Sequence, residues 1–498
     1  MIETQDRRAL VAVDLGAESC RVSLLRWIGG EPRIELLHRV PNGPVFEPAK
    51  GENGELRWPL DTILTGIEEG LRKAAAAAPE GIRSIAVDGW AVDYVRLGED
   101  GKPLAAPFCY RDVRTESAKA YADALLPPKK LFSQTGAQPL RINTLYQLIA
   151  DAQTTTEDSV AVGSRISRKA PWILLPEYLL FWLGGQRVAE YTNATHTGLV
   201  DLPSGQWSVQ LFKLFGLDIA AAPPIVPTGS VIGKVSNNLK ELAAFADTDL
   251  IAPACHDTAS AIAAVNQNLS QTAYIVSGTW SLVGTVIEDP NTTMNAFDFG
   301  FTNQGAATGG FCFHTNINGM WLLKQCLDHW QIEGRNIDLP TLIAQAAQIE
   351  KIPALLNVDA PTLMLAGRMP ERINYQLEGY QLEGIETHTI PDEPGNEPVF
   401  ARLIFASLAA RYAVTLRNLE MLTGRSFQRI TILGGGSRNA LLRRLTEEST
   451  GLPVTMGEAE GSTLGNFVVQ LAVGNAKECQ PDGGFPQRVR AWAARLAN

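Results

Sequence analysis

Two segments of the chain share a pattern of apolar positions that predicts a β-hairpin. The segment LVAVDLGAESCRVSLLRW (residues 10–27) has an apolar run, a turn of small residues, and a second run of alternating character from Arg21 to Trp27. Such alternation is typical of a half-buried strand. The segment AYIVSGTWSLVGTVIEDP (residues 273–290) repeats this arrangement. One hairpin in each half of the chain indicates an internal duplication.

Strand and helix patterns alternate through the rest of the chain, which predicts an α/β fold. SIAVDGWAVDYVRL (residues 84–97) favours strand, turn, strand, and the apolar run at 171–183 favours a buried helix ending at Gly184. Apolar positions from Arg402 to Leu422 form a helical stripe that Gly424 ends. A proline-rich stretch precedes residue 250, so we expect two domains, 1–250 and 251–498.

Composition narrows the class of protein. The 498 residues are too many for one core, and the net charge of −10 argues against a nucleic-acid or anionic-membrane partner. No signal peptide opens the chain, and no uninterrupted apolar run approaches the roughly 18–20 residues of a membrane span. The six cysteines are scattered without C-x-x-C spacing, so we expect a reducing, cytoplasmic compartment and no zinc site.

The segment PACHDTASAIAAV (residues 253–265) places a histidine and an aspartate inside a small, apolar run. One interpretation is a helix N-cap, in which Asp257 or Thr258 accepts from the free backbone N–H groups of an alanine-rich helix. That interpretation accounts for the aspartate but leaves the neighbouring His256 unexplained.

Three other features are candidates for binding phosphate. The glycines at 434–436 lie between a predicted strand and helix, where they allow a nucleotide to approach or simply form a tight turn. Asp14 ends the first strand beside a turn of small residues. A carboxylate in this position either holds hydrated Mg²⁺ or is an ordinary hairpin-turn aspartate. The hydroxyls of Ser277 and Thr279 are suited to phosphate oxygens. Together these are the parts of a two-domain phosphotransferase.

The chain resembles the FGGY carbohydrate kinases. The matching segments run in family order from about residue 10 to 475 and include VAVDLGAESCRVSLL, SIAVDGWAVDYVRL, YRDVRT, NTLYQL, EYTNATHTGLVDLPSGQWS, HDTASAIAAV, SGTWSLVG, NINGMWLLKQC and ILGGGSRNALLRRLT. HDTA followed by SGTWS is the most specific signal. The resemblance implies two actin/hexokinase-like (ribonuclease H-like) domains, each with a five-stranded mixed sheet, the sugar-binding side in 1–250 and the nucleotide-binding side in 251–498, with the active site in the cleft.

The resemblance also implies roles for individual residues. Asp257 is the implied base that takes the proton from the attacking sugar hydroxyl, and Asp14 is the implied holder of Mg²⁺ through water. ATP is implied to contact Ala17, Glu18, Ser19, Cys20, Arg21, Thr279, Lys324 and Gly435. The sugar is implied to contact Trp90, Ala91, His256, Asp257, Thr258 and Asn316. The implied partners are ATP and a small-molecule ketose, with L-rhamnulose the most similar case.

The chain departs from the family's usual motifs at Glu18, Cys20, Ala91 and Lys324, and the stretch 138–141 before NTLYQL is less apolar than in the family. Glu18 adds negative charge beside phosphate, Ala91 adds a methyl to a small pocket, and Lys324 fits a solvated helix face equally well. L-Fuculose or a pentulose such as xylulose stay open as alternatives to L-rhamnulose. A catalytically dead sugar sensor and an actin-like or chaperone-like ATPase are the rival classes. The sequence leaves monomer and homodimer open.

Overall fold

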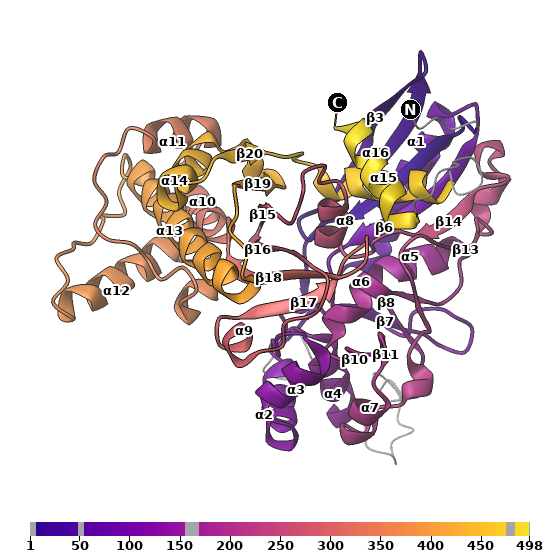
Figure 1. The fold of residues 1–498 in the computed structure, drawn as a ribbon, viewed down its shortest axis with the longest axis horizontal. Coiled ribbons are helices and arrows are strands. Elements are labelled where there is room, and N and C mark those ends of the chain that lie inside the picture. Colours follow the sequence, from indigo (N-terminus) through magenta and orange to yellow (C-terminus); the bar gives the residue numbers. More distant parts are fainter. Residues whose placement is uncertain (1–5, 48–53, 155–168, 475–483, 498) are drawn as a thin grey trace.

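The computed structural model describes residues 6–47, 54–154, 169–474 and 484–497. Two six-stranded mixed sheets form its centre (Figure 1). In sheet order, the first contains β13 (Ser230–Lys234), β14 (Asp249–Ala252), β6 (Ile82–Gly89), β1 (Ala9–Leu15), β2 (Ser19–Ile28) and β3 (Glu31–Pro41). The second contains β17 (Phe301–Gly305), β18 (Phe311–Asn318), β16 (Trp280–Ile287), β15 (Thr272–Ser277), β19 (Arg429–Leu433) and β20 (Val454–Met456).

The two sheets share one core topology. In the first, β1 is antiparallel to β2, β2 is antiparallel to β3, and β1, β6 and β14 are parallel. In the second, β15, β16 and β18 repeat the antiparallel arrangement, while β15, β19 and β20 are parallel. Both predicted hairpins and the duplication are therefore confirmed. Each sheet has one strand more than the expected five, because an antiparallel edge strand, β13 or β17, is added.

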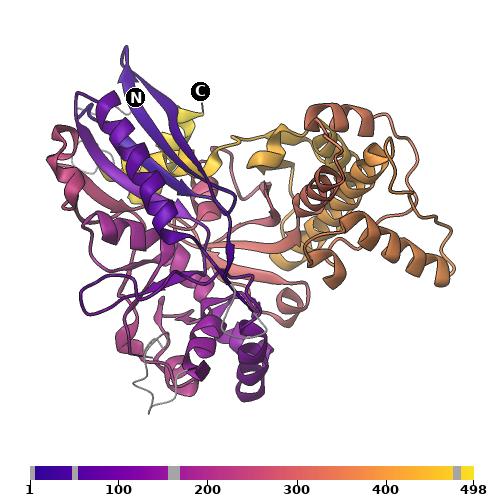
Figure 2. The same ribbon diagram turned by 180° about the vertical axis from the view of Figure 1, so that it is seen from behind.

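The described residues form sixteen α-helices, some of which pack on the faces of the two sheets and some in a separate core. They are α1 (Leu60–Ala77), α2 (Thr115–Leu125), α3 (Pro128–Thr135), α4 (Thr144–Thr154), α5 (Leu175–Leu183), α6 (Tyr191–Ala194), α7 (Val209–Leu214), α8 (Asp257–Ala263), α9 (Met294–Asp298), α10 (Trp321–Ile332), α11 (Leu339–Ala346), α12 (Met369–Leu382), α13 (Glu397–Thr423), α14 (Ala440–Thr450), α15 (Gly461–Gly474) and α16 (Phe485–Leu496). Helix α1 lies on one face of the first sheet, seen in front in Figure 2, and the C-terminal helices α15 and α16 lie on the other, in yellow in Figure 1.

Four short strand pairs complete the fold: β4 (Val45–Glu47) with β5 (Glu55–Arg57), β7 (Tyr94–Arg96) with β8 (Trp172–Leu174), β9 (Ala189–Glu190) with β12 (Ile225–Val226), and β10 (Val200–Asp201) with β11 (Gln206–Trp207). The expected single helix over 171–183 is wrong in part. Its first residues pair as β8, and the helix begins at Leu175 because Pro176 is tolerated only in a first turn. The helix over 402–422 is confirmed as part of α13, which Gly424 ends in a left-handed conformation.

Helix α8 lies between the two sheets, and this explains why its segment is rich in alanine. Ala259 and Ala263 pack with the first sheet and α15, whereas Ala261 and Ile262 pack with the second sheet. Helix α15 approaches so closely that a Cβ at Gly465 would lie 1.7 Å from the carbonyl oxygen of Ser260. The start of α8, and with it Asp257, is therefore fixed between the two halves of the molecule.

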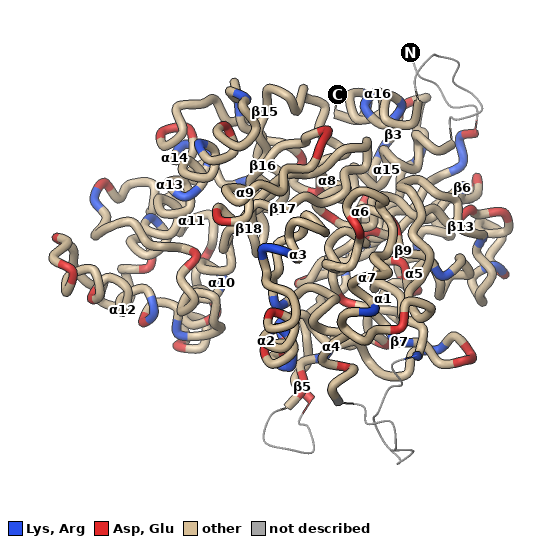
Figure 3. The backbone as a smooth tube through the Cα atoms, turned by 60° about the horizontal axis from the view of Figure 1, so that its bottom comes forward, with Lys and Arg blue, Asp and Glu red and all other residues tan. Residues whose placement is uncertain are grey.

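Helix α13 is the one helix of the described ranges that is long and apolar enough to cross a membrane. Two thirds of its most apolar window is buried, and Phe400, Leu403 and Ile404 belong to the core beneath the second sheet. A core helix passes the same test of length and composition. Acidic and basic residues are interspersed along the part of the chain that the structure describes (Figure 3).

Candidate active site

A cleft of about 330 Å³ is lined by elements of both sheets. The turn of the first hairpin, the end of β6 and the start of α8 line it from one side, and the turn of the second hairpin, β18 and the glycine turn after β19 line it from the other. Eleven of the predicted site residues line this cleft: Asp14, Ala17, Arg21, Trp90, Ala91, His256, Asp257, Thr258, Thr279, Asn316 and Gly435.

Asp14 lies at the end of β1 and is almost fully buried. Its carboxylate accepts hydrogen bonds from Arg21 Nη1 at 3.0 Å and from Ser462 Oγ at 2.7 Å. Burial raises the pKa of Asp14, and the charge of Arg21 opposes that shift. Arg21 Nε also lies 3.1 Å from Glu460. The N-terminal hairpin is thus tied to the start of α15, more than 400 residues away in the chain.

A second buried carboxyl group, Asp88, lies beside Asp14 because β1 and β6 are parallel and the two residues are paired in register. Asp88 Oδ1 accepts from Asn466 Nδ2 at 2.6 Å, whereas the buried Oδ2 has no partner. Burial, and then the charges of Asp14 and Asp257, raise its pKa well above the ordinary value. Mg²⁺ prefers carboxylate oxygens as ligands, so Asp14, which lines the cleft, fits a hydrated Mg²⁺, and Asp88 is its fully buried neighbour, which does not line the cleft.

Asp257 is the first residue of α8 and lines the cleft. Burial raises its pKa to about 6, while a 3.1 Å hydrogen bond from Thr258 Oγ1 opposes the shift. His256 Nε2 lies 3.3 Å from this carboxylate, and burial lowers the pKa of His256 to about 3, so the imidazole is neutral. The N-cap residue is His256 and not Asp257 or Thr258, and the His256 side chain makes no capping hydrogen bond. The carboxylate is directed to the cleft instead.

The turns of the two hairpins meet across the cleft. Thr279 Oγ1 donates a 3.0 Å hydrogen bond to Glu18 Oε1, so the two sheets contact each other through side chains that the resemblance places at phosphate. The glycine turn lies next to them. A Cβ at Gly436 would lie 2.0 Å from Ser277 Oγ, whereas a Cβ at Gly435 would meet open space. Gly435 therefore presents bare backbone to the cleft.

Four predicted ATP-contacting residues do not line the cleft: Glu18, Ser19, Cys20 and Lys324. Strand β2 includes Ser19, Cys20 and Arg21, and successive side chains of a strand point to opposite faces. Arg21 faces the cleft, so Cys20 lies in the core of the first sheet, where it is fully buried. Lys324 forms an ion pair of 2.9 Å with Asp328, one turn later on α10.

Several cleft residues were not predicted from the sequence. The most polar are His196, Gln304, Glu460 and Ser462, and Tyr110 adds an aromatic side chain. His196 lies within EYTNATHTG and Tyr110 begins YRDVRT, two segments that carry the family resemblance without implying a role for these residues. Glu460 directly precedes α15 and Ser462 lies in its first turn, and this stretch carries no recognisable motif.

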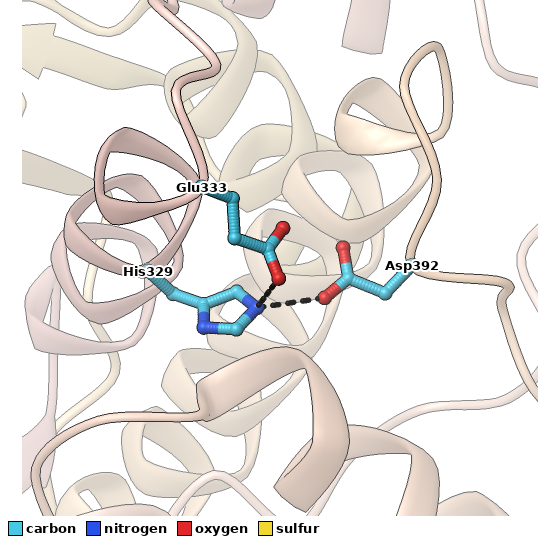
Figure 4. A group of neighbouring side chains, drawn as sticks. All are labelled: His329, Glu333 and Asp392. Atoms are coloured by element: carbon cyan, nitrogen blue, oxygen red, sulfur yellow. Dashed lines mark hydrogen bonds and ion pairs between the residues drawn. The ribbon is translucent and has the colours of Figure 1, made fainter.

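A second cluster of titratable residues lies away from the cleft. His329 Nε2 is 3.3 Å from Glu333 and 2.9 Å from Asp392 (Figure 4). Asp392 also accepts from Trp330 Nε1 at 3.0 Å, and Arg335 pairs with both acids. Because a guanidinium already neutralises the carboxylates, this cluster is an ion-pair network between α10 and the segment before α13.

Comparison with known proteins identifies the class. Residues 9–264 match the N-terminal domain of the FGGY family of carbohydrate kinases, and residues 273–473 match the C-terminal domain of that family. The chain belongs to this family. It is a carbohydrate kinase, a phosphotransferase with a sugar alcohol group as acceptor, and the kinases of this family use ATP.

Solved structures share the fold over nearly the whole chain. A ligand-bound xylulose kinase from Lactobacillus acidophilus has a TM-score of 0.73 at 17% identity, covering 98% of this chain and 96% of its own. A gluconate kinase from the same organism gives 0.72 at 17% identity, with the same coverage. Plasmodium falciparum glycerol kinase with ADP gives 0.72 at 14% identity, covering 97% and 92%. The expected pair of actin/hexokinase-like domains is confirmed.

Proposed function

We propose that this kinase phosphorylates a ketose at its 1-hydroxyl, with L-rhamnulose as the preferred substrate, and is thus an L-rhamnulokinase. The observation that carries the proposal is the position of Asp257. It is a half-exposed carboxyl that faces the cleft, its pKa is raised to about 6, and both hairpin turns and the bare backbone of Gly435 line the same cleft.

In this proposal Asp257 is the general base. Its carboxylate takes the proton of the sugar's 1-hydroxyl as that oxygen forms a bond to the γ-phosphorus of ATP, and the bond from phosphorus to the bridging oxygen of ADP breaks. Neutral His256 beside it adds no positive charge, so the carboxylate keeps its affinity for the proton. The product is a ketose 1-phosphate.

Asp14 is the residue we assign to hydrated Mg²⁺, which neutralises phosphate charge during phosphoryl transfer. Asp14 is held by Arg21 and Ser462, and Asp88 by Asn466, so both carboxylates are oriented before the nucleotide binds. Thr279, Ala17 and Arg21 face the phosphates in this assignment, and Gly435 lies against the adenosine.

The sugar is assigned to the part of the cleft next to the first sheet. Trp90, Ala91, Tyr110 and Ile142 supply apolar surface there, which suits the terminal methyl of a 6-deoxy-ketose. One methyl in such a pocket is worth about 1–3 kcal/mol, so related ketoses should react less efficiently instead of being excluded.

We further propose a cytoplasmic location, since the described cysteines are free and buried.

The test is coupled ADP release with L-rhamnulose, L-fuculose, L-xylulose and D-xylulose as acceptors. We expect the highest kcat/KM for L-rhamnulose. If kcat/KM for a pentulose exceeds that for L-rhamnulose tenfold or more, the substrate assignment is wrong, although the protein is still a sugar kinase. L-Fuculose or a pentulose is the second candidate, because Ala91 adds a methyl to the wall of the pocket.

A further inference from the structure

One wall of the cleft is polar, and its residues come from three different elements. His196 lies in the 3-10 turn Thr195–Thr197, Gln304 in β17, and His256 before α8. Each is only 7% exposed, and each lines the cleft. The turn is tied to the strand because Gly305 N donates to Thr195 Oγ1 at 2.9 Å. The side chains of this wall are therefore held in place by burial and by the hydrogen bond between the turn and β17.

Two atoms of this wall are buried without a partner. Gln304 Nε2 lies 2.8 Å from His196 Nδ1, but His196 Nε2 and Gln304 Oε1 make no hydrogen bond. The amide donates to Nδ1, so in the neutral imidazole the proton lies on Nε2. Burial and the nearby His256 lower the pKa of His196 well below its ordinary value, which keeps it neutral. The wall thus offers one donor and one acceptor side by side.

The orientation of these groups is fixed before a ligand binds. The rings of His196 and His256 lie 3.8 Å apart between centroids at an angle of 51°. His256 in turn lies 3.3 Å from the Asp257 carboxylate. The polar wall is therefore continuous with the group that we assign as the base, and a molecule that contacts Asp257 also reaches His196.

We propose that His196 Nε2 and Gln304 Oε1 bind hydroxyls of the ketose away from the phosphorylated one, and so determine which stereoisomer is accepted. The inference rests on the proposed function. A sugar hydroxyl both accepts and donates, so one hydroxyl or a vicinal pair satisfies the N–H of His196 and the oxygen of Gln304 together. An epimer that moves the hydroxyl leaves two buried polar atoms unpaired, and such a mismatch discriminates more strongly than a methyl.

The test uses Gln304→Leu, which removes the acceptor at similar size, and His196→Phe, which removes both ring nitrogens. For each variant, kcat/KM is measured for L-rhamnulose and L-fuculose, which are epimers, and binding of each sugar without ATP is measured by calorimetry. We expect kcat/KM for the preferred ketose to fall about 10²-fold, mainly through KM, and the ratio between the two sugars to move toward one. His196→Gln, which keeps a donor, should restore part of the ratio.

His314→Gln is the matched control. This histidine is also buried and also has an unpartnered Nε2, but it does not line the cleft. We expect this variant to leave the sugar ratio unchanged. A merely structural role for His196 and Gln304 would lower activity on all sugars equally, and a ratio that stays at the wild-type value in both variants overturns the inference.

The readouts separate this inference from the proposed function. Wild-type protein that releases no ADP with any ketose contradicts the proposed function. In that case the inference is still tested by the ratio of the calorimetric affinities for L-rhamnulose and L-fuculose. If this ratio is the same in the variants as in the wild type, or if the wild type binds no ketose, the inference is overturned. Should His196→Phe fail to fold, Gln304→Leu alone decides, because it leaves both histidines in place.

Discussion

Thr279 donates a hydrogen bond of 3.0 Å to the carboxylate of Glu18, and this bond joins the turns of the two hairpins. We assign Thr279 to the phosphates of ATP, so the Glu18 carboxylate, which accepts from the Thr279 hydroxyl at the edge of the cleft, competes with phosphate for that hydroxyl and also repels it. We predict that Glu18→Ala lowers the KM for ATP by about three- to tenfold, a modest effect because Glu18 is exposed and its charge is screened.

Initial rates at varied ATP concentration and at two salt concentrations check this prediction. Glu18→Gln is the control that keeps an acceptor for Thr279 without the charge, and its KM should fall between those of the other two proteins. A KM for Glu18→Ala that is higher than that of the wild type would show that Glu18 supports nucleotide binding.

The glycine turn after β19 offers a matched pair of substitutions. Gly435→Ala places a methyl in open cleft space, so we expect unchanged stability and a KM for ATP raised about tenfold by the clash with adenosine. Gly436→Ala places a methyl 2.0 Å from Ser277 Oγ, so we expect a loss of stability of about 1–3 kcal/mol. Thermal unfolding and ATP kinetics on both variants separate the roles. An unchanged KM in Gly435→Ala removes this residue from the nucleotide site.

The pH dependence of kcat/KM reports on the base. Burial raises the pKa of Asp257 to about 6, and a base must be deprotonated to act. Activity should therefore be at a plateau above pH 7 and fall tenfold per pH unit well below 6. His256 does not produce this limb, because burial lowers its pKa to about 3. An acid limb near pH 4, the range of an ordinary aspartate, would contradict the assigned environment.

Stability at alkaline pH depends on Glu177, a fully buried residue of α5. Burial raises its pKa to about 8 from 4.5, so the folded protein binds a proton that the unfolded chain releases. Its contribution to stability is complete below pH 4.5, declines as the pH rises, and is lost above 8. Gln stays uncharged at every pH, so it carries no buried negative charge at pH 9. Glu177→Gln should therefore raise the Tm at pH 9 relative to the wild type, and by less at pH 5.

Thermal scans at both pH values check this, with exposed Glu99→Gln as the control that should leave Tm unchanged at either pH. A Glu177→Gln protein with the same Tm difference at pH 5 and pH 9 would show that Glu177 keeps one protonation state across that range.

The parts of the site that lie within one element could be predicted from the sequence. Asp14 ends a strand and Asp257 begins a helix, and both positions follow from local patterns of apolar and small residues. The resemblance implies phosphate contacts for the whole run 17–21, whereas the alternation of side chains along a strand places Cys20 in the core.

Contacts between distant segments could not be predicted. Ser462 reaches Asp14 across 448 positions, and Gln304 reaches His196 across 108. These pairs depend on α15 returning to the first sheet and on the edge strand β17, which is absent from the expected five-stranded core. The pairing of Asp88 with Asp14 depends in the same way on a parallel register that no local pattern fixes.

The most direct test of the account is ADP release by Asp257→Asn, measured with L-rhamnulose beside the wild type. Asparagine keeps the size and polarity of the side chain but does not take a proton. We expect kcat to fall about 10²- to 10⁴-fold, with sugar affinity and Tm retained. A variant whose kcat stays within a few-fold of the wild type would contradict the assignment of Asp257 as the base, and with it the mechanism proposed for this cleft.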